Sequence, residues 1–274
     1  MKHTGFRSTL IYGLRGIMLL RYAGIRHGLG TILRNFWQEY YLVEFEQAKV
    51  MYNVTLPVDG KIPFKSRAFG AYANFIFPIA AFVGFIYQHG GKSSLPDLEK
   101  FLLDIADFYT DAGKVFRHSQ TTFKRTGQEW QVALLRLLDK EKNSAPSLHV
   151  AIVSYVYFRG SELLERYASP TADKSKAVLL RYACKVIDST LLIKQHCVRD
   201  VALAFAVVTF RHPTFRSVQQ LFINDLFVHS TVRVSASVRD EARQDISRLY
   251  IAITKKGEGI EDIISYLSGL PESM

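Results

Sequence analysis

His196 and Asp200 stand four residues apart in the stretch "KQHCVRD", so a helix would place them as neighbours on one face. A carboxylate that is hydrogen-bonded to one ring nitrogen of a histidine fixes the tautomer of that ring. The other ring nitrogen then becomes a better nucleophile or base, as in a catalytic triad. The pair could do such chemistry, although the same spacing also occurs in ordinary surface ion pairs.

A second histidine, His149, follows a polar turn and begins an uncharged, mostly apolar segment. Pro146 and Ser147 suit the first turn of a helix, because proline gives up only an amide that lacks an intrahelical partner there. We expect Asn143 or Ser144 to cap that start. Free amides and the positive end of the helix dipole make such a terminus a place for phosphate, which His149 would face.

Helical patterns dominate the elements that would position these residues. Apolar residues recur at spacings of three and four over 95–116 and over 129–141, and strand-like alternation is scarce. Over 237–253 the apolar residues fall on one face with charged residues opposite, which is typical of a water-exposed amphipathic helix. These patterns predict an all-α fold.

The most apolar part of the chain is the uncharged segment 68–91, which is long enough for a helix that needs about 20 residues to cross a bilayer. Basic residues flank both of its ends, so they indicate no orientation. The apolar segments 143–158 and 201–210 are shorter, and the mean hydropathy of the chain is only +0.04. The sequence favours an integral membrane protein, with a soluble or peripheral membrane protein as the alternative.

The chain is basic, since 35 Lys and Arg against 25 Asp and Glu give a formal net charge of +10. This charge favours anionic partners such as lipid head groups or phosphates. The basic residues are scattered among apolar helices without a reader motif, so we expect no nucleic-acid binding. Two cysteines, without a CxxC pair or a Cys/His cluster, suggest neither a disulfide framework nor a structural metal.

In chain order, the two histidine motifs resemble those of the type 2 phosphatidic acid phosphatase (PAP2) superfamily. "PSLH" (146–149) matches the family pattern P-S-x-H, and "STLLIKQHCVRD" (189–200) matches S-R-x5-H-x3-D except that Thr190 replaces the arginine. The family's K-x6-R-P motif has no counterpart, because the chain contains no Arg-Pro dipeptide. These departures resemble the branch that contains inositol phosphorylceramide synthases.

The resemblance covers roughly residues 56–212, which would form a PAP2-like catalytic core. It implies an all-α, membrane-embedded bundle of about six core helices. Residues 1–55 would then be an N-terminal helical region, and residues 213–274 a polar C-terminal helical extension.

The resemblance also implies an activity, that of a metal-independent lipid phosphate phosphatase or phospholipid head-group phosphotransferase without a cofactor. His196 would attack phosphorus to form a phosphohistidine intermediate, and Asp200 would orient its ring. His149 would protonate the leaving alkoxide and then activate water or an acceptor hydroxyl. Residues expected to bind the phosphorylated lipid are Ser147, Ser189, Lys194, Lys124 and Arg125.

Two other functions stay open. A catalytically degenerate relative could bind anionic lipids through its basic surface, which the missing first motif and Thr190 favour. A soluble relative could hold another oxyanion, as the vanadate-dependent haloperoxidases of the superfamily do, but such a site wants bidentate arginine contacts.

Overall fold

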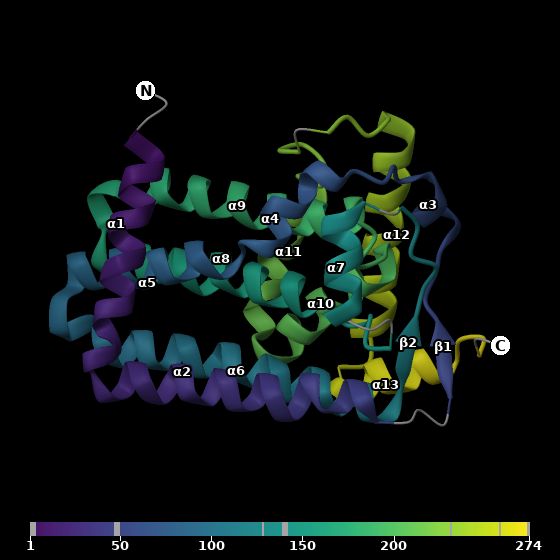
Figure 1. Ribbon diagram of the computed structural model, residues 1–274, viewed down its shortest axis with the longest axis horizontal. Coiled ribbons are helices and arrows are strands. Elements are labelled where there is room, and N and C mark those ends of the chain that lie inside the picture. Colours follow the sequence, from purple (N-terminus) through teal and green to yellow (C-terminus); the bar gives the residue numbers. More distant parts are fainter. Residues whose placement is uncertain are drawn as a thin grey trace.

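The computed structural model describes residues 4–46, 50–127, 129–138, 142–230, 232–257 and 259–272. These residues are mostly helical, which confirms the prediction of an α fold in its broad form (Figure 1). Two short strands are β1 (Met51–Asn53) and β2 (Gln120–Thr122). The helices are α1 (Thr4–Met18), α2 (Ala23–Asn35), α3 (Pro57–Lys61), α4 (Phe69–Ala73), α5 (Ile76–Gly90), α6 (Leu95–His118), α7 (Trp130–Leu138), α8 (Leu148–Tyr167), α9 (Ala172–Leu192), α10 (Val198–Arg211), α11 (Gln219–Asn224), α12 (Ala236–Thr254) and α13 (Ile260–Ser268).

The helices predicted from apolar periodicity are found. The pattern over 95–116 forms α6, and the pattern over 237–253 forms α12. The pattern over 129–141 forms α7, and its last residues, 139–141, lie outside the described residues. The apolar face of α12 is buried and the helix packs on α10.

The two N-terminal helices pack on helices from the middle of the chain. α1 packs on α5 and α2 packs on α6, and Figure 1 shows the second pair side by side. The first pair approaches closely at glycines. A Cβ atom on Gly16 would meet the carbonyl oxygen of Ala80 at 2.3 Å, and one on Gly84 would meet that of Tyr12 at 2.1 Å. Only glycine allows such backbone contact, which is common between membrane helices.

The apolar segment 68–91 is interrupted by a turn at Asn74 and Phe75, between α4 and α5. α5 alone has 15 residues, or about 22 Å, which is shorter than the roughly 30 Å hydrocarbon core of a bilayer. In the described part of the chain, one run of consecutive helices, Ser66–His118, which includes α4, α5 and α6, contains a window that is long and apolar enough to span a membrane. Its most apolar window has a mean hydropathy of 1.8 and is 39% buried. By length and composition it is a candidate span.

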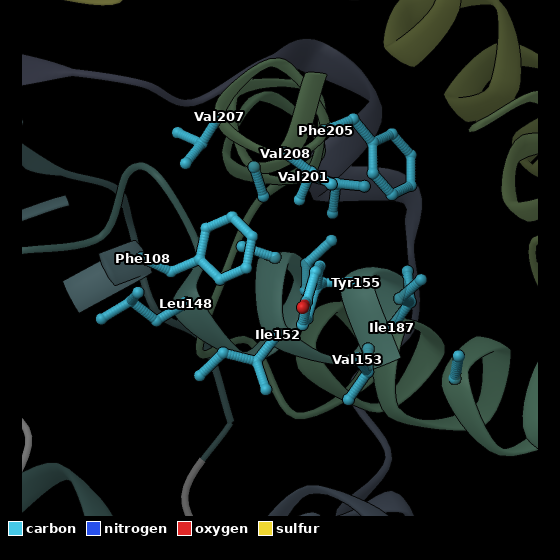
Figure 2. Packing of buried hydrophobic residues seen from close by; sticks show 14 of the residues in the cluster. Phe108, Leu148, Ile152, Val153, Tyr155, Ile187, Val201, Phe205, Val207 and Val208 are labelled. Atoms are coloured by element: carbon cyan, nitrogen blue, oxygen red, sulfur yellow. The ribbon is translucent and has the colours of Figure 1, made fainter. Parts of the chain in front are cut away.

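The centre of the fold is an apolar cluster built by α6, α8, α9 and α10 (Figure 2). Phe108 of α6 packs edge-on against Tyr155 of α8, with ring centroids 5.2 Å apart. Ile187 of α9 and Val201 and Phe205 of α10 are buried in the same cluster. Each such side chain contributes roughly 1.5–3 kcal/mol on burial. The cluster therefore fixes α8 and α10 relative to each other.

A short parallel ribbon holds the loop that precedes α8. β1 pairs with β2 so that Tyr52 lies opposite Thr121, and Thr121 also forms a bridge to Asn143. The hydroxyl of Thr121 accepts a hydrogen bond from the amide of Ala145 at 2.8 Å. These contacts tie residues from three parts of the chain together at the start of α8.

Candidate functional site

His149 lies in the first turn of α8, as predicted, but the predicted cap is wrong. Ser147, with φ −69° and ψ 110°, is the N-cap, and its hydroxyl accepts a hydrogen bond from the amide of Val150 at 3.4 Å. A cap must lie where the backbone changes from extended to helical, and that point is Ser147. Asn143 and Ser144 lie upstream in the loop and do not cap the helix. The prediction that Pro146 and Ser147 form the first turn is also wrong, because α8 begins at Leu148.

His196 and Asp200 form the predicted pair, although His196 lies in the loop just before α10 and only Asp200 is helical. The Nδ1 atom of His196 is 3.2 Å from a carboxylate oxygen of Asp200 and 3.0 Å from the carbonyl oxygen of Ser144. A carbonyl oxygen can only accept a hydrogen bond, so Nδ1 carries a proton. In the neutral ring Nε2 then keeps its lone pair, which is the tautomer that a nucleophile needs.

The carboxylate of Asp200 is fully buried and has donors on both oxygens. The hydroxyl of Ser144 donates to Oδ2, and the amide of Cys197 donates to the same oxygen at 3.1 Å. The thiol of Cys197 donates to Oδ1 at 3.1 Å. Burial raises the pKa of the Cys197 thiol, which keeps it protonated as a donor. These donors hold the carboxylate in the orientation that His196 uses.

Hydrogen bonds join the two histidine motifs into one structure. The amide of Ser147 donates to the backbone carbonyl of Asp200 at 3.3 Å, which links the start of α8 to the first turn of α10. The rings of His149 and His196 have centroids 6.0 Å apart and are inclined at 53°. At this separation both rings can contact one small tetrahedral anion.

The ring of His149 packs against two aromatic rings from the segment around the α4–α5 turn. The ring of Tyr72 stacks on it with centroids 4.1 Å apart, and the ring of Phe75 is tilted at 4.5 Å. His149 has no hydrogen bond to another described residue. Burial and, secondly, the neighbouring His196 lower the pKa of His149 to about 3. The imidazole is therefore neutral near pH 7 unless an anion binds beside it.

The loop that carries His196 is held by residues that have no recognisable motif. The guanidinium of Arg136 on α7 donates to the carbonyl oxygen of Ile193 at 3.2 Å and to the side chain of Gln195 at 3.3 Å. Asp59 on α3 accepts the amide of Val198 at 2.9 Å. No motif in the sequence indicated that Arg136, Asp59, Tyr72 and Phe75 are parts of the site.

The five residues predicted to bind substrate lie in different environments. Ser147 is buried as the N-cap, where its oxygen accepts, so its hydroxyl hydrogen stays available. The hydroxyl of Ser189 donates within α9 to the carbonyl oxygen of residue 186 at 2.6 Å. The ammonium of Lys194 donates to the backbone carbonyl of residue 59 at 2.5 Å. Lys124 and Arg125 lie in the loop after β2, and no contact between described residues joins them to either imidazole.

Among the residues that the structure describes, no group of three or more His, Cys, Asp or Glu side chains is placed to hold a metal ion. Comparison with known proteins yields no relative: no family model, no curated protein and no solved structure matches the chain. Any function assigned to the chain therefore rests on the geometry of the imidazole pair.

Proposed function

We propose that this protein is a metal-independent lipid phosphate phosphatase or head-group phosphotransferase of the PAP2 type. The observation that supports it most is the separation of 6.0 Å between the rings of His149 and His196, with the Nδ1 proton of His196 held by two acceptors. One imidazole is set up as a nucleophile and the other as an acid or base on the same anion. A PAP2-like core of about six helices is part of this proposal.

In the first step, the Nε2 lone pair of His196 attacks phosphorus, and the bond from phosphorus to the leaving oxygen breaks. The proton on His149 passes to that oxygen, so the alcohol leaves neutral. The phosphorylated ring of His196 is cationic, because it still carries its Nδ1 proton. The buried carboxylate of Asp200, 3.2 Å from Nδ1, stabilises this charge.

In the second step, water or an acceptor hydroxyl attacks phosphorus from the side that the leaving alcohol has vacated. Neutral His149 accepts the proton of the attacking oxygen, and the bond between phosphorus and Nε2 breaks. His196 returns to its neutral form with the proton still on Nδ1. At the end of the second step His149 again carries the proton that it had at the start of the first step, and it returns this proton to solvent when the product leaves.

The charge of the phosphate makes this assignment of His149 self-consistent. In the free protein the pKa of His149 is lowered to about 3, so the ring is neutral and could not act as an acid. A phosphate dianion beside the ring favours the protonated form and raises that pKa. The amides in the first turn of α8 add to the positive potential around the anion. Substrate binding thus charges the acid that the first step needs.

An apolar outer surface supports a lipid substrate. α1 exposes a row of large apolar side chains, and the candidate span Ser66–His118 packs beside it through α5. We propose that this region is embedded in a membrane, where an exposed apolar face needs no protein partner. The exposed apolar residues of α1 are Ile11, Leu14, Ile17 and Met18.

Trapping the intermediate tests the proposal. Purified protein is mixed with a panel of lipid phosphates and phosphodiesters that carry a radiolabel on phosphorus, and the reaction is quenched in alkali. The protein is then digested, and mass spectrometry identifies the peptide that carries the label. We expect label on His196, and none in His196→Ala. The matched control is His229→Ala, because His229 also pairs with an aspartate four residues away, Asp225, at 3.1 Å. Label that survives in His196→Ala, or label on another residue, would refute the mechanism.

A second candidate is a lipid-binding protein that has this fold without turnover. Two observations favour it: Lys194 already donates a hydrogen bond to a backbone carbonyl, and Thr190 stands where the family pattern has arginine. Phosphate release by the wild type that is lost in His149→Ala excludes this candidate.

A further inference from the structure

An apolar cavity of about 180 Å³ lies between α1, α2, α5 and α6. Almost all of its walls are aliphatic or aromatic side chains, and none of the described residues that line it is charged. A cavity of this kind does not hold water well, because water needs polar partners. Its chemistry suits a hydrocarbon. Representative wall residues are Leu20, Leu29, Ile79, Val83, Leu102 and Ile105.

The cavity adjoins the imidazole pair. Phe75 lines the cavity, and the same ring lies 4.5 Å from the ring of His149. Ile152 also lines the cavity, and it follows His149 by three residues on α8, which places both on one face of the helix. The Phe75 ring is therefore a wall common to the cavity and the candidate site.

The cavity is bordered on its outer side by exposed apolar residues. Ile17 at the end of α1 is 56% exposed, and Leu20 in the turn that follows α1 is 41% exposed. Ile76 at the start of α5 is 64% exposed. A polar ligand would find no hydrogen-bond partner among these exposed apolar side chains. A chain that enters sideways from a bilayer would stay in apolar surroundings along its whole path.

We propose that this cavity holds one hydrocarbon chain of the phosphate ester whose head group lies between His149 and His196. The inference rests on the proposed function and adds a limit to chain length. On α5 the lining runs from Ile76 to Val83, a rise of about 10 Å. Methylenes beyond that distance leave the cavity and contribute no further contact.

The test uses n-alkyl phosphonates, which carry the head group but cannot be hydrolysed. Binding of butyl, octyl and dodecyl phosphonate to the purified full chain in one detergent is measured by calorimetry. Affinity is expected to rise about fourfold per methylene, which corresponds to about 0.8 kcal/mol, and then to level off. Leu29→Trp fills the cavity from α2, and should weaken octyl phosphonate at least tenfold while changing butyl phosphonate less than twofold.

The matched control is Leu33→Trp, on the same helix but 67% exposed and outside the cavity lining. Each phosphonate partitions into the detergent to the same extent with either variant. The difference in affinity between the two variants is therefore independent of that partition. Leu29→Ala, which enlarges the cavity, should move the levelling-off to longer chains. This variant keeps the proposal testable if Leu29→Trp does not fold.

Equal octyl phosphonate affinity in Leu29→Trp and Leu33→Trp would overturn the proposal. So would a change of oligomeric mass in Leu29→Trp without a change in chain preference, because the cavity would then be an interface between two copies. Failure of the proposed function gives a different result: butyl phosphonate binding that is unchanged in His149→Ala, and no label on His196. The chain preference is read from the ratio of octyl to butyl affinity in either case.

Discussion

The hydroxyl of Ser144 donates a hydrogen bond to the carboxylate of Asp200, from a loop 56 residues away in the chain. The backbone carbonyl of the same serine accepts the Nδ1 proton of His196 at 3.0 Å. One residue outside both histidine motifs thus contacts both members of the pair. In the proposed mechanism Ser144 would position the pair without touching a reacting atom.

Replacing Ser144 by alanine should therefore slow turnover without weakening substrate binding. A hydrogen bond to a charged group contributes roughly 1.5–3 kcal/mol, so we expect kcat to fall about 10- to 100-fold with KM little changed. The control is Ser154→Ala: Ser154 is also fully buried, and its hydroxyl has no hydrogen-bond partner among the described residues. Steady-state kinetics on one phosphate ester compare the two variants. Equal rates would show that Ser144 has no positioning role.

Anion binding should take up a proton at His149. The pKa of His149 in the free protein is about 3, below its usual value, and a bound dianion raises it. Between the free and the bound pKa, binding takes up protons, so anion affinity must strengthen as the pH falls through that interval. Sulfate is the probe, because it does not titrate in this range. Calorimetry in two buffers of different ionisation enthalpy measures the uptake, which should vanish in His149→Phe. Uptake that persists in that variant would contradict the assignment.

Two glycine substitutions should change stability in opposite directions. Gly84→Ala places a Cβ 2.1 Å from a carbonyl oxygen of α1, and forcing these helices apart should lower the free energy of unfolding by about 1–3 kcal/mol. A Cβ atom on Gly30 of α2 meets nothing within 4 Å. Because alanine has a higher helix propensity than glycine, Gly30→Ala should raise the free energy of unfolding by about 0.5–1 kcal/mol. Thermal unfolding of both variants checks the signs. A neutral Gly84→Ala would mean that α1 and α5 are not in backbone contact.

Membrane embedding predicts resistance to extraction. The candidate span Ser66–His118 and the exposed apolar face of α1 should keep the full chain in the membrane pellet after an alkaline carbonate wash. A peripheral marker protein in the same membranes should be released. Release of this protein together with the marker would exclude embedding and would favour the soluble or peripheral alternative.

The features that the sequence predicted are those with a local pattern. α6 and α12 follow from apolar periodicity. The pairing of His196 with Asp200 was predicted from their spacing, although His196 makes this contact from the loop before α10 and not from the helix. The cap of α8 was misplaced, because several cap-forming residues stand in one short turn and only the backbone geometry selects Ser147.

The parts that the sequence could not predict depend on contacts between distant segments. Phe75 contacts His149 because a turn divides the apolar segment 68–91, whose composition predicts a single helix. Arg136 reaches the loop before His196 across 57 residues, and no periodicity marks it. Asp59 stands in a turn-like stretch, and its bond to the start of α10 depends on tertiary packing. Such residues support a site without sharing its motif.

The hydrogen bonds of His196 also determine the chemistry of any phosphorylated form. Since Nδ1 is committed to Ser144 and Asp200, only Nε2 is free to bond to phosphorus. The proposed mechanism therefore predicts the tele isomer, 3-phosphohistidine, and not the pros isomer. Isomer-specific antibodies or phosphorus NMR can distinguish the two isomers directly. Because Nε2 both forms and breaks the bond to phosphorus, the ring of His196 would not need to rotate between turnovers.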